Sequence, residues 1–118
     1  MKYVDGYVLP VPKKRVKEYL KMAKFGEKMW RKFGAIDYKE CVGNDLRSPW
    51  GTTFTKMMKT KPNETVIFAY IVFKSRAHRD QVNKKVMAAM AKSGDTPPEM
   101  PFNPKRMVYG GFTAAVGG

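Results

Sequence analysis

Residues 65–73 read "TVIFAYIVF", and this stretch decides the fold. It contains no charged side chain and is rich in β-branched and aromatic residues, so it predicts a strand in the middle of a sheet. Successive side chains of a strand point to opposite faces, and here both sets are apolar or aromatic. One set is Val66, Phe68, Tyr70 and Val72, and the other is Ile67, Ala69, Ile71 and Phe73.

A sheet that is apolar on both faces needs a cover on each of them. One layer of helices covers one face only. We therefore expect the second face to pack against the same face of another copy, which predicts a homodimer joined sheet to sheet.

Outside this strand, hydrophobic periodicity predicts three more strands, two long helices and one short helix. The strands are expected at 2–11, 35–43 and 105–113, the long helices at 13–33 and 76–92, and the short helix at 52–60. Pro10 and Pro12 are expected to end the first strand. Two right-handed βαβ units in this order predict an α+β fold, a ferredoxin-like βαββαβ plait with a four-stranded antiparallel sheet. In such a plait the first and third strands lie in the middle, with the last strand beside the first.

Length and composition narrow the class of protein. The 118 residues are enough for a single domain, 1–118, with a core of its own. No apolar run approaches the roughly 18 residues of a membrane span, and the N-terminus lacks the pattern of a signal peptide, so we expect a cytoplasmic protein. One cysteine and one histidine argue against a disulfide and against a metal site, and no cofactor is expected.

Several short segments carry a family resemblance. "YVDGY" (3–7), "ECVGND" (40–45), "NKKVM" (83–87) and "PFNPKRMVYGGF" (101–112) follow one another in this order. Together they resemble the YbaA-type bacterial proteins, a family of unknown function in the dimeric α/β-barrel superfamily. The resemblance covers nearly the whole chain and implies a dimer whose two sheets close into a barrel. It implies no activity.

Four polar residues form the candidate ligand site: Asp5, Tyr7, Glu40 and Arg106. Asp5 and Tyr7 share one face of the first strand, and Arg106 is expected on the neighbouring last strand. A carboxylate, a phenol and a guanidinium in a cavity on the sheet face, between two sheets, would hold a small polar or anionic molecule or move a proton. The alternative is a structural Asp5–Arg106 ion pair at the rim of the dimer interface, since a buried charge needs a partner whether or not a ligand exists.

The sequence assigns no catalytic residue. It contains no phosphate-binding glycine loop, no G-x-S-x-G turn and no set of metal ligands. The first functional hypothesis is therefore a small-molecule-binding homodimer that extends, by analogy with its superfamily, to a cofactor-independent enzyme.

Three further residues or pairs have both a structural and a functional interpretation. Gly110-Gly111 predicts a bend or bulge in the last strand, or room for a ligand. His78, in the first turn of a helix, is expected to be a surface or capping residue, with a general base as the alternative. Cys41 is expected to be a small buried apolar residue, with a reactive thiol as the alternative.

The second functional hypothesis concerns charge. The chain carries a net charge of +13, and residues 13–32 contain nine Lys or Arg and only two Glu. One face of this helix is expected to carry a basic stripe: Lys17, Lys21, Lys24, Lys28 and Arg31. Such a stripe is typical of non-specific binding to nucleic acid or another polyanion, with a solvated helix face as the alternative.

Overall fold

The computed structural model describes residues 1–93 and 100–117. Its elements are β1 (Tyr3–Pro12), a 3-10 turn η1 (Lys13–Arg15), α1 (Val16–Lys32), β2 (Asp37–Val42), α2 (Phe54–Met57), β3 (Glu64–Phe73), α3 (Arg76–Ser93), a 3-10 turn η2 (Pro104–Arg106) and β4 (Val108–Thr113). The chain therefore has the predicted α+β fold, and the short helix forms where it was expected, with the Thr53 side chain accepting a hydrogen bond from the Lys56 amide.

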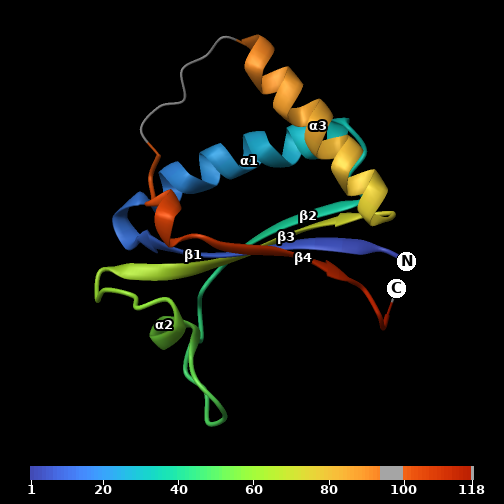
Figure 1. Ribbon diagram of the computed structural model, residues 1–118. Coiled ribbons are helices and arrows are strands. Elements are labelled where there is room, and N and C mark those ends of the chain that lie inside the picture. The colour runs from blue at the N-terminus through green and yellow to red at the C-terminus, as the bar shows by residue number, and fades with distance from the viewer. Residues whose placement is uncertain (94–99, 118) are drawn as a thin grey trace.

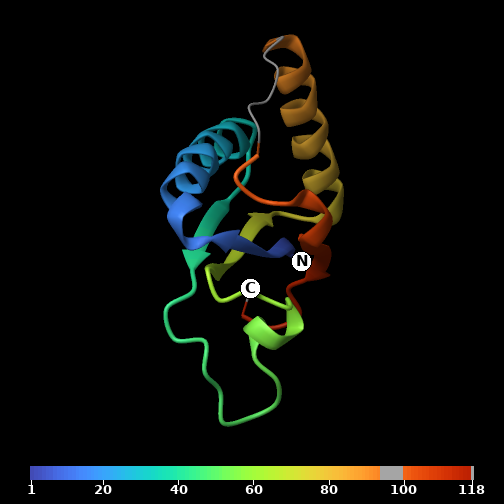
Figure 2. The same cartoon turned by 90° about the vertical axis from the view of Figure 1, so that its left-hand side faces the viewer.

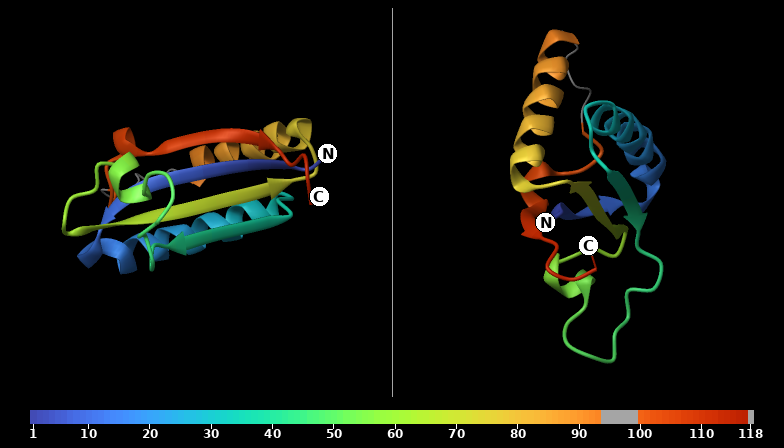
Figure 3. Two further views of the ribbon diagram at one scale, coloured as in Figure 1. Left: turned by 90° about the horizontal axis from the view of Figure 1, so that it is seen from below. Right: turned by 90° about the vertical axis from the view of Figure 1, so that its right-hand side faces the viewer.

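The four strands form one antiparallel sheet in the order β2-β3-β1-β4. β1 pairs with β3 from Tyr3–Phe73 to Pro12–Glu64, and with β4 from Tyr3–Thr113 to Val8–Val108. Figure 3 shows β1 and β3 in the middle of the sheet, which places the most apolar strand where it gains most from burial.

Both long helices cover the same face of the sheet. Figures 1 and 2 show α1 lying along the sheet, whereas α3 rises away from it toward its C-terminal end. The side chains of Ile67, Ala69, Ile71 and Phe73 point into this helix-covered side and are at most 5% exposed. No described helix is long and apolar enough to span a membrane.

The opposite face of the sheet, the open sheet face, keeps apolar side chains in solvent. Phe68 is 44% exposed, Val108 56% and Phe112 62%. Val8 lies opposite both Phe68 on β3 and Val108 on β4, so these side chains form one row across three strands. In Figure 1, α2 and its flanking loops hang below this face at one end of the sheet.

Two details of the strands differ from the sequence prediction. Pro10 does not end the first strand, which continues to Pro12 and ends there; both prolines pair with β3. They are tolerated because β4 borders β1 only as far as Val8, which leaves this part of β1 as a sheet edge where a missing N–H does no harm. The last strand begins at Val108, and Lys105 and Arg106 belong to η2, because Pro104 and the Asn103 side chain start a 3-10 turn there.

No bulge forms at Gly110-Gly111, since β4 pairs with β1 without interruption. Gly111 serves a different purpose. A Cβ atom at this position would lie within 3 Å of the Tyr3 ring, so the glycine makes room for that side chain. Gly110 has no such neighbour, because its nearest contact would be an ordinary one with Phe112.

Candidate functional site

A cavity of about 160 Å³ lies under α1, against the helix-covered face of the sheet. Its lining comes from α1, from the three strands β1, β2 and β3, and from the segment before β4. The main lining residues are Tyr7, Leu9, Tyr19, Trp30, Tyr38, Glu40, Ala69, Ile71, Phe102 and Met107. We refer to this space as the Glu40 cavity.

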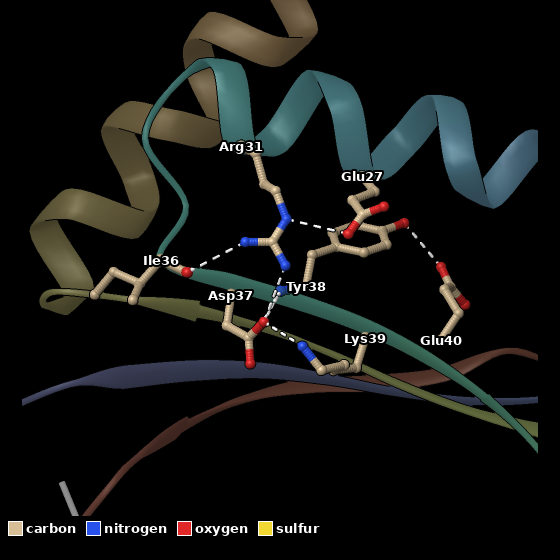
Figure 4. Close-up of polar contacts among 7 residues, drawn as sticks. All are labelled: Glu27, Arg31, Ile36, Asp37, Tyr38, Lys39 and Glu40. Atoms are coloured by element: carbon tan, nitrogen blue, oxygen red, sulfur yellow. Dashed lines mark hydrogen bonds and ion pairs between the residues drawn. The ribbon is translucent and has the colours of Figure 1, made fainter.

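Glu40 is the only acidic residue among the described residues that line the cavity. Its Oε1 accepts a hydrogen bond of 2.7 Å from the Tyr19 hydroxyl, and its Oε2 accepts one of 2.8 Å from the Tyr38 hydroxyl. Burial, together with the Glu40 charge, raises the pKa of both phenols, so both stay protonated as donors at neutral pH. Figure 4 shows Tyr38 and Glu40 extending from neighbouring positions of β2 toward α1.

Gly26 permits this arrangement. It is buried within α1, where glycine costs about 1 kcal/mol of helix stability relative to alanine. A Cβ atom there would lie 2.8 Å from the Tyr38 hydroxyl oxygen. The glycine therefore allows Tyr38 to reach Glu40 under the helix.

Aromatic rings form most of the cavity wall. Tyr19 and Phe102 meet edge to face at 5.7 Å, and Trp30 and Tyr38 lie tilted at 6.3 Å between ring centroids. The Trp30 indole N–H donates to the Asn83 side-chain oxygen at 3.0 Å, which fixes the ring between α1 and α3. Tyr7 closes the β1 side, and burial raises the pKa of its hydroxyl.

A second carboxylate, Asp5, lies on the same side of the sheet but outside the cavity lining. It is completely buried, and the Arg79 guanidinium donates to its Oδ1 at 2.7 Å. The other oxygen, Oδ2, has no hydrogen-bond partner within 1–93 and 100–117. Burial raises the pKa of Asp5, while the Arg79 charge and the nearby Asn83 amide lower it in part.

Arg106 lies elsewhere. Its guanidinium donates to both carboxylate oxygens of Glu64, at 2.7 and 3.1 Å, and to the Lys59 carbonyl at 3.1 Å. This contact lowers the pKa of Glu64 and ties the segment after α2 to the segment before β4. The Asp5–Arg106 pair that the sequence offered as an alternative does not form, because the register places Asp5 opposite Gly111, five residues away from Arg106.

The four predicted site residues therefore do not form a single site. Asp5, Tyr7 and Glu40 all lie on the sheet face that the helices cover, and not on the open sheet face where a cavity between two sheets was expected. Tyr7 and Glu40 line the same cavity, whereas Asp5 pairs with Arg79 and Arg106 pairs with Glu64.

A surface groove adjoins the cavity at the β2 edge. Tyr38 and Glu40 line both spaces, and Lys24, Glu27 and Lys39 line only the groove. Beside it, Arg31 bridges α1 and β2 by bonding Glu27 at 3.1 Å and Asp37 at 3.0 Å. Figure 4 shows Arg31 between Glu27 and Asp37, beside Tyr38.

The predicted basic stripe lies on the surface. Lys17, Lys21, Lys24 and Lys28 are all exposed, and no salt bridge within the described ranges involves any of them. Arg31 is different, since its charge is already shared with Glu27 and Asp37.

His78 is a capping residue, as predicted. Its Nδ1 accepts a hydrogen bond of 3.0 Å from the Lys74 amide, and its own amide donates to the Ser75 hydroxyl at 3.1 Å. Cys41 is exposed, not buried, because its parity on the edge strand β2 places it opposite Phe68 on the open sheet face. Among the described residues no group of three or more His, Cys, Asp or Glu could hold a metal ion.

Sequence reasoning missed Tyr19, Trp30 and Tyr38 as site residues, because aromatic residues at core spacing are indistinguishable from ordinary packing. Two signals were available. Glu40 follows Tyr38 by two residues and so must share its sheet face, and a glycine in the middle of a long helix calls for a close neighbour.

The chain is similar to known proteins over nearly its whole length. A family model described as "Protein of unknown function (DUF1428)" matches residues 2–104. The chain is 37% identical over 118 residues to "Uncharacterized protein YbaA" of Escherichia coli strain K12, with 98% of each chain covered, and the same values hold for the protein of that name from Shigella flexneri. Among solved structures it resembles "De novo designed protein Foldit4" with a TM-score of 0.46 and 9% identity, over 96% of this chain and 98% of that one.

Proposed function

Because the chain belongs to the DUF1428 family of proteins of unknown function, we propose its function from its own site: a homodimeric protein that binds one small molecule per protomer in the Glu40 cavity. The observation that carries this proposal is the Glu40 carboxylate, which two tyrosine hydroxyls hold in place in a cavity lined by aromatic side chains. A carboxylate can accept more than the two hydrogen bonds that Tyr19 and Tyr38 supply, so Glu40 keeps acceptor capacity for a ligand.

The size and lining of the cavity support a ligand of about one ring. A cavity of roughly 150 Å³ with an apolar lining accommodates benzene. Ligand sites typically combine apolar and aromatic walls with a few placed polar groups, and the Glu40 cavity has this composition. A ligand that is small and mostly apolar, with one group that interacts with a carboxylate, fits best.

The structure gives less support to the anionic ligand that the sequence suggested. That expectation depended on Arg106, whose charge is shared with Glu64. If the proposal is extended to a cofactor-independent enzyme, Glu40 would be the group that exchanges a proton with the substrate, and the surrounding phenols, which stay protonated, would donate hydrogen bonds.

The assembly that we propose is a dimer through the open sheet face. The row formed by Phe68, Val8 and Val108, with Phe112 nearby, supports it, since apolar side chains at 44–62% exposure gain from a cover. The strand order β2-β3-β1-β4 with two helices on one face supports a ferredoxin-like plait, and two such sheets face to face would form an α/β barrel. The single free cysteine supports a cytoplasmic location.

Sedimentation equilibrium tests the assembly. We expect a dimer at micromolar concentration for the wild type and a monomer for Phe112→Glu. Met87→Glu is the matched control, because Met87 is 55% exposed on α3, in the helix layer. A monomeric wild type, or equal dissociation by both variants, would refute the sheet-to-sheet dimer.

Ligand-detected NMR with neutral and charged one-ring or branched probes tests the binding site. Ala69→Leu fills the cavity from the floor of the sheet, since Ala69 is 5% exposed and lines it. We expect saturable probe binding to the wild type and none to Ala69→Leu, with Ala88→Leu on the exposed side of α3 as the control. Probe binding that survives Ala69→Leu would place the site elsewhere.

A second candidate function is polyanion binding by α1. The exposed lysines Lys17, Lys21, Lys24 and Lys28 support it, because each is available to a phosphate and successive ones follow the helix at 1.5 Å rise per residue. We expect affinity for generic duplex and single-stranded RNA to fall steeply between low and physiological salt, and to fall further when all four lysines become glutamine. Weak binding at low salt, or no effect of the four substitutions, would leave a solvated helix face.

A further inference from the structure

We infer that the ligand of the Glu40 cavity is a small organic cation, of the alkylammonium class. This inference rests on the proposed function and names the chemical class that the site accepts. Three observations carry it: the charge inside the cavity, the type of side chain around it, and its size.

The first observation is an unbalanced negative charge. Of the 23 Lys and Arg in the chain, none is among the described residues that line the cavity, and no salt bridge within 1–93 or 100–117 involves Glu40. Within the described residues, the two most buried carboxylates each have a cation of their own, since Asp5 has Arg79 and Glu64 has Arg106. A partly buried charge is normally paired, and in a chain with a net charge of +13 the missing partner at Glu40 is conspicuous.

The second observation is the set of aromatic side chains that line the cavity. Tyr7, Tyr19, Trp30, Tyr38 and Phe102 all line the cavity. The faces of such rings carry partial negative charge, and cages of two or more rings are a known way to bind quaternary ammonium groups. Because the pKa of each of the three phenols is raised, the rings remain neutral π donors at neutral pH.

The third observation is size. At about 160 Å³ the cavity accommodates a group such as trimethylammonium with a short substituent. Glu40 lies at the boundary with the outer groove, so a cation in the cavity would have the carboxylate on one side and the rings of Trp30 and Phe102 among its other neighbours.

Choline and 3,3-dimethyl-1-butanol test the inference, because they have nearly the same shape and differ in charge. Isothermal titration of the full chain is expected to give at least tenfold tighter binding of choline than of the neutral alcohol. Glu40→Gln is expected to remove that preference while still binding the neutral probe. Glu27→Gln is the matched control, since Glu27 lines the groove but not the cavity, and it should keep the preference.

Each alternative result has a distinct meaning. Equal affinity for the two probes would overturn the cation inference and leave a neutral ligand in the proposed cavity. A preference for choline that survives Glu40→Gln would overturn the role given to Glu40 and leave the aromatic rings as the source of the preference. If neither binds but benzyl alcohol does, the cation inference fails alone. If no probe binds and Ala69→Leu changes nothing, the proposed cavity site fails with it.

Discussion

Asp5 and Glu40 lie on the same side of the same sheet, but their carboxylates have different partners. Asp5 is completely buried and is neutralised from within the chain by Arg79 at 2.7 Å. Glu40 is only partly buried, accepts hydrogen bonds from two neutral phenols, and forms no salt bridge with any described residue. We therefore interpret Asp5 as a structural residue, and Glu40 as the residue that the proposed ligand would contact.

The surroundings of the two carboxylates differ in the same way. Asp5 is surrounded by groups that link β1 to α3, and Arg79 also stacks over the Tyr3 ring at 4.9 Å and bonds Asp80 at 2.8 Å. Glu40 instead borders a cavity on one side and a surface groove on the other. Changes near Asp5 should therefore affect stability most, and changes near Glu40 should affect binding most.

The largest expected effect comes from removing Arg79. Arg79→Leu leaves Asp5 buried without a cation, and breaking such a pair costs about 3–5 kcal/mol. Urea denaturation should show this loss in the free energy of unfolding. The control is Arg47→Leu, because Arg47 is 95% exposed and its pair with Asp45 should contribute little. Asp5→Asn combined with Arg79→Leu should recover much of the loss; no recovery would mean that Arg79 acts through packing alone.

The pH dependence of stability gives a second, smaller effect. Because the pKa of Asp5 is raised on folding, the folded state binds more protons than the unfolded state between the ordinary Asp value and the raised one. In that window the Asp5 contribution makes stability fall as pH rises, by at most about 1.4 kcal/mol per pH unit. The lowered pKa of Glu64 acts with the opposite sign, so the stability of wild type and Asp5→Asn should be compared at each pH. A difference that is constant over pH 4–7 would contradict this account of Asp5.

The third prediction concerns the support of Glu40 by α1. Gly26→Ala should gain about 1 kcal/mol in helix propensity but place a methyl group against the Tyr38 hydroxyl, and overpacking costs about 1–3 kcal/mol. We expect a net loss of about 1 kcal/mol by thermal denaturation. In a Tyr38→Phe background the hydroxyl is gone, and the same Gly26→Ala change should become neutral or stabilising. Equal losses in both backgrounds would show that Tyr38 is not what the glycine accommodates.

An effect on stability as small as that of Gly26→Ala is expected at Glu40 itself. Glu40→Gln keeps one carbonyl oxygen that can accept a hydrogen bond from one phenol. The other phenol would then donate to water in the cavity, so the free energy of unfolding should fall by about 1 kcal/mol. The exposed Glu18→Gln is the reference for a simple change of charge. A loss as large as that of Arg79→Leu would mean that Glu40 is as structural as Asp5, and the comparison would fail.

The sequence predicted the elements and the α+β class because hydrophobic periodicity is local. "TVIFAYIVF" required a central strand, and the spacing of Val16, Tyr19, Leu20 and Ala23 required a helix over it. The four-stranded antiparallel sheet and the family resemblance are confirmed.

The candidate site was predicted only in part, since it depends on which distant side chains meet. Parity correctly grouped Asp5 with Tyr7, but it could not reveal that Arg79, 74 positions further along, reaches Asp5. Arg106 was misplaced because Asn103-Pro104 starts a 3-10 turn where a strand was expected. The cavity lining combines residues of α1, β1, β2, β3 and the segment before β4, and no local pattern shows that these segments meet.

The chain's two tryptophans make a direct test of the central claim, that the Glu40 cavity is a ligand site. Trp30 lines the cavity and Trp50 is 83% exposed, far from it in sequence and in a loop. Titration with tetramethylammonium, followed by the two indole N–H signals in ¹H–¹⁵N NMR, should shift the Trp30 signal saturably and leave the Trp50 signal unchanged. Two unmoved signals, or two signals that drift together without saturation, would contradict the account.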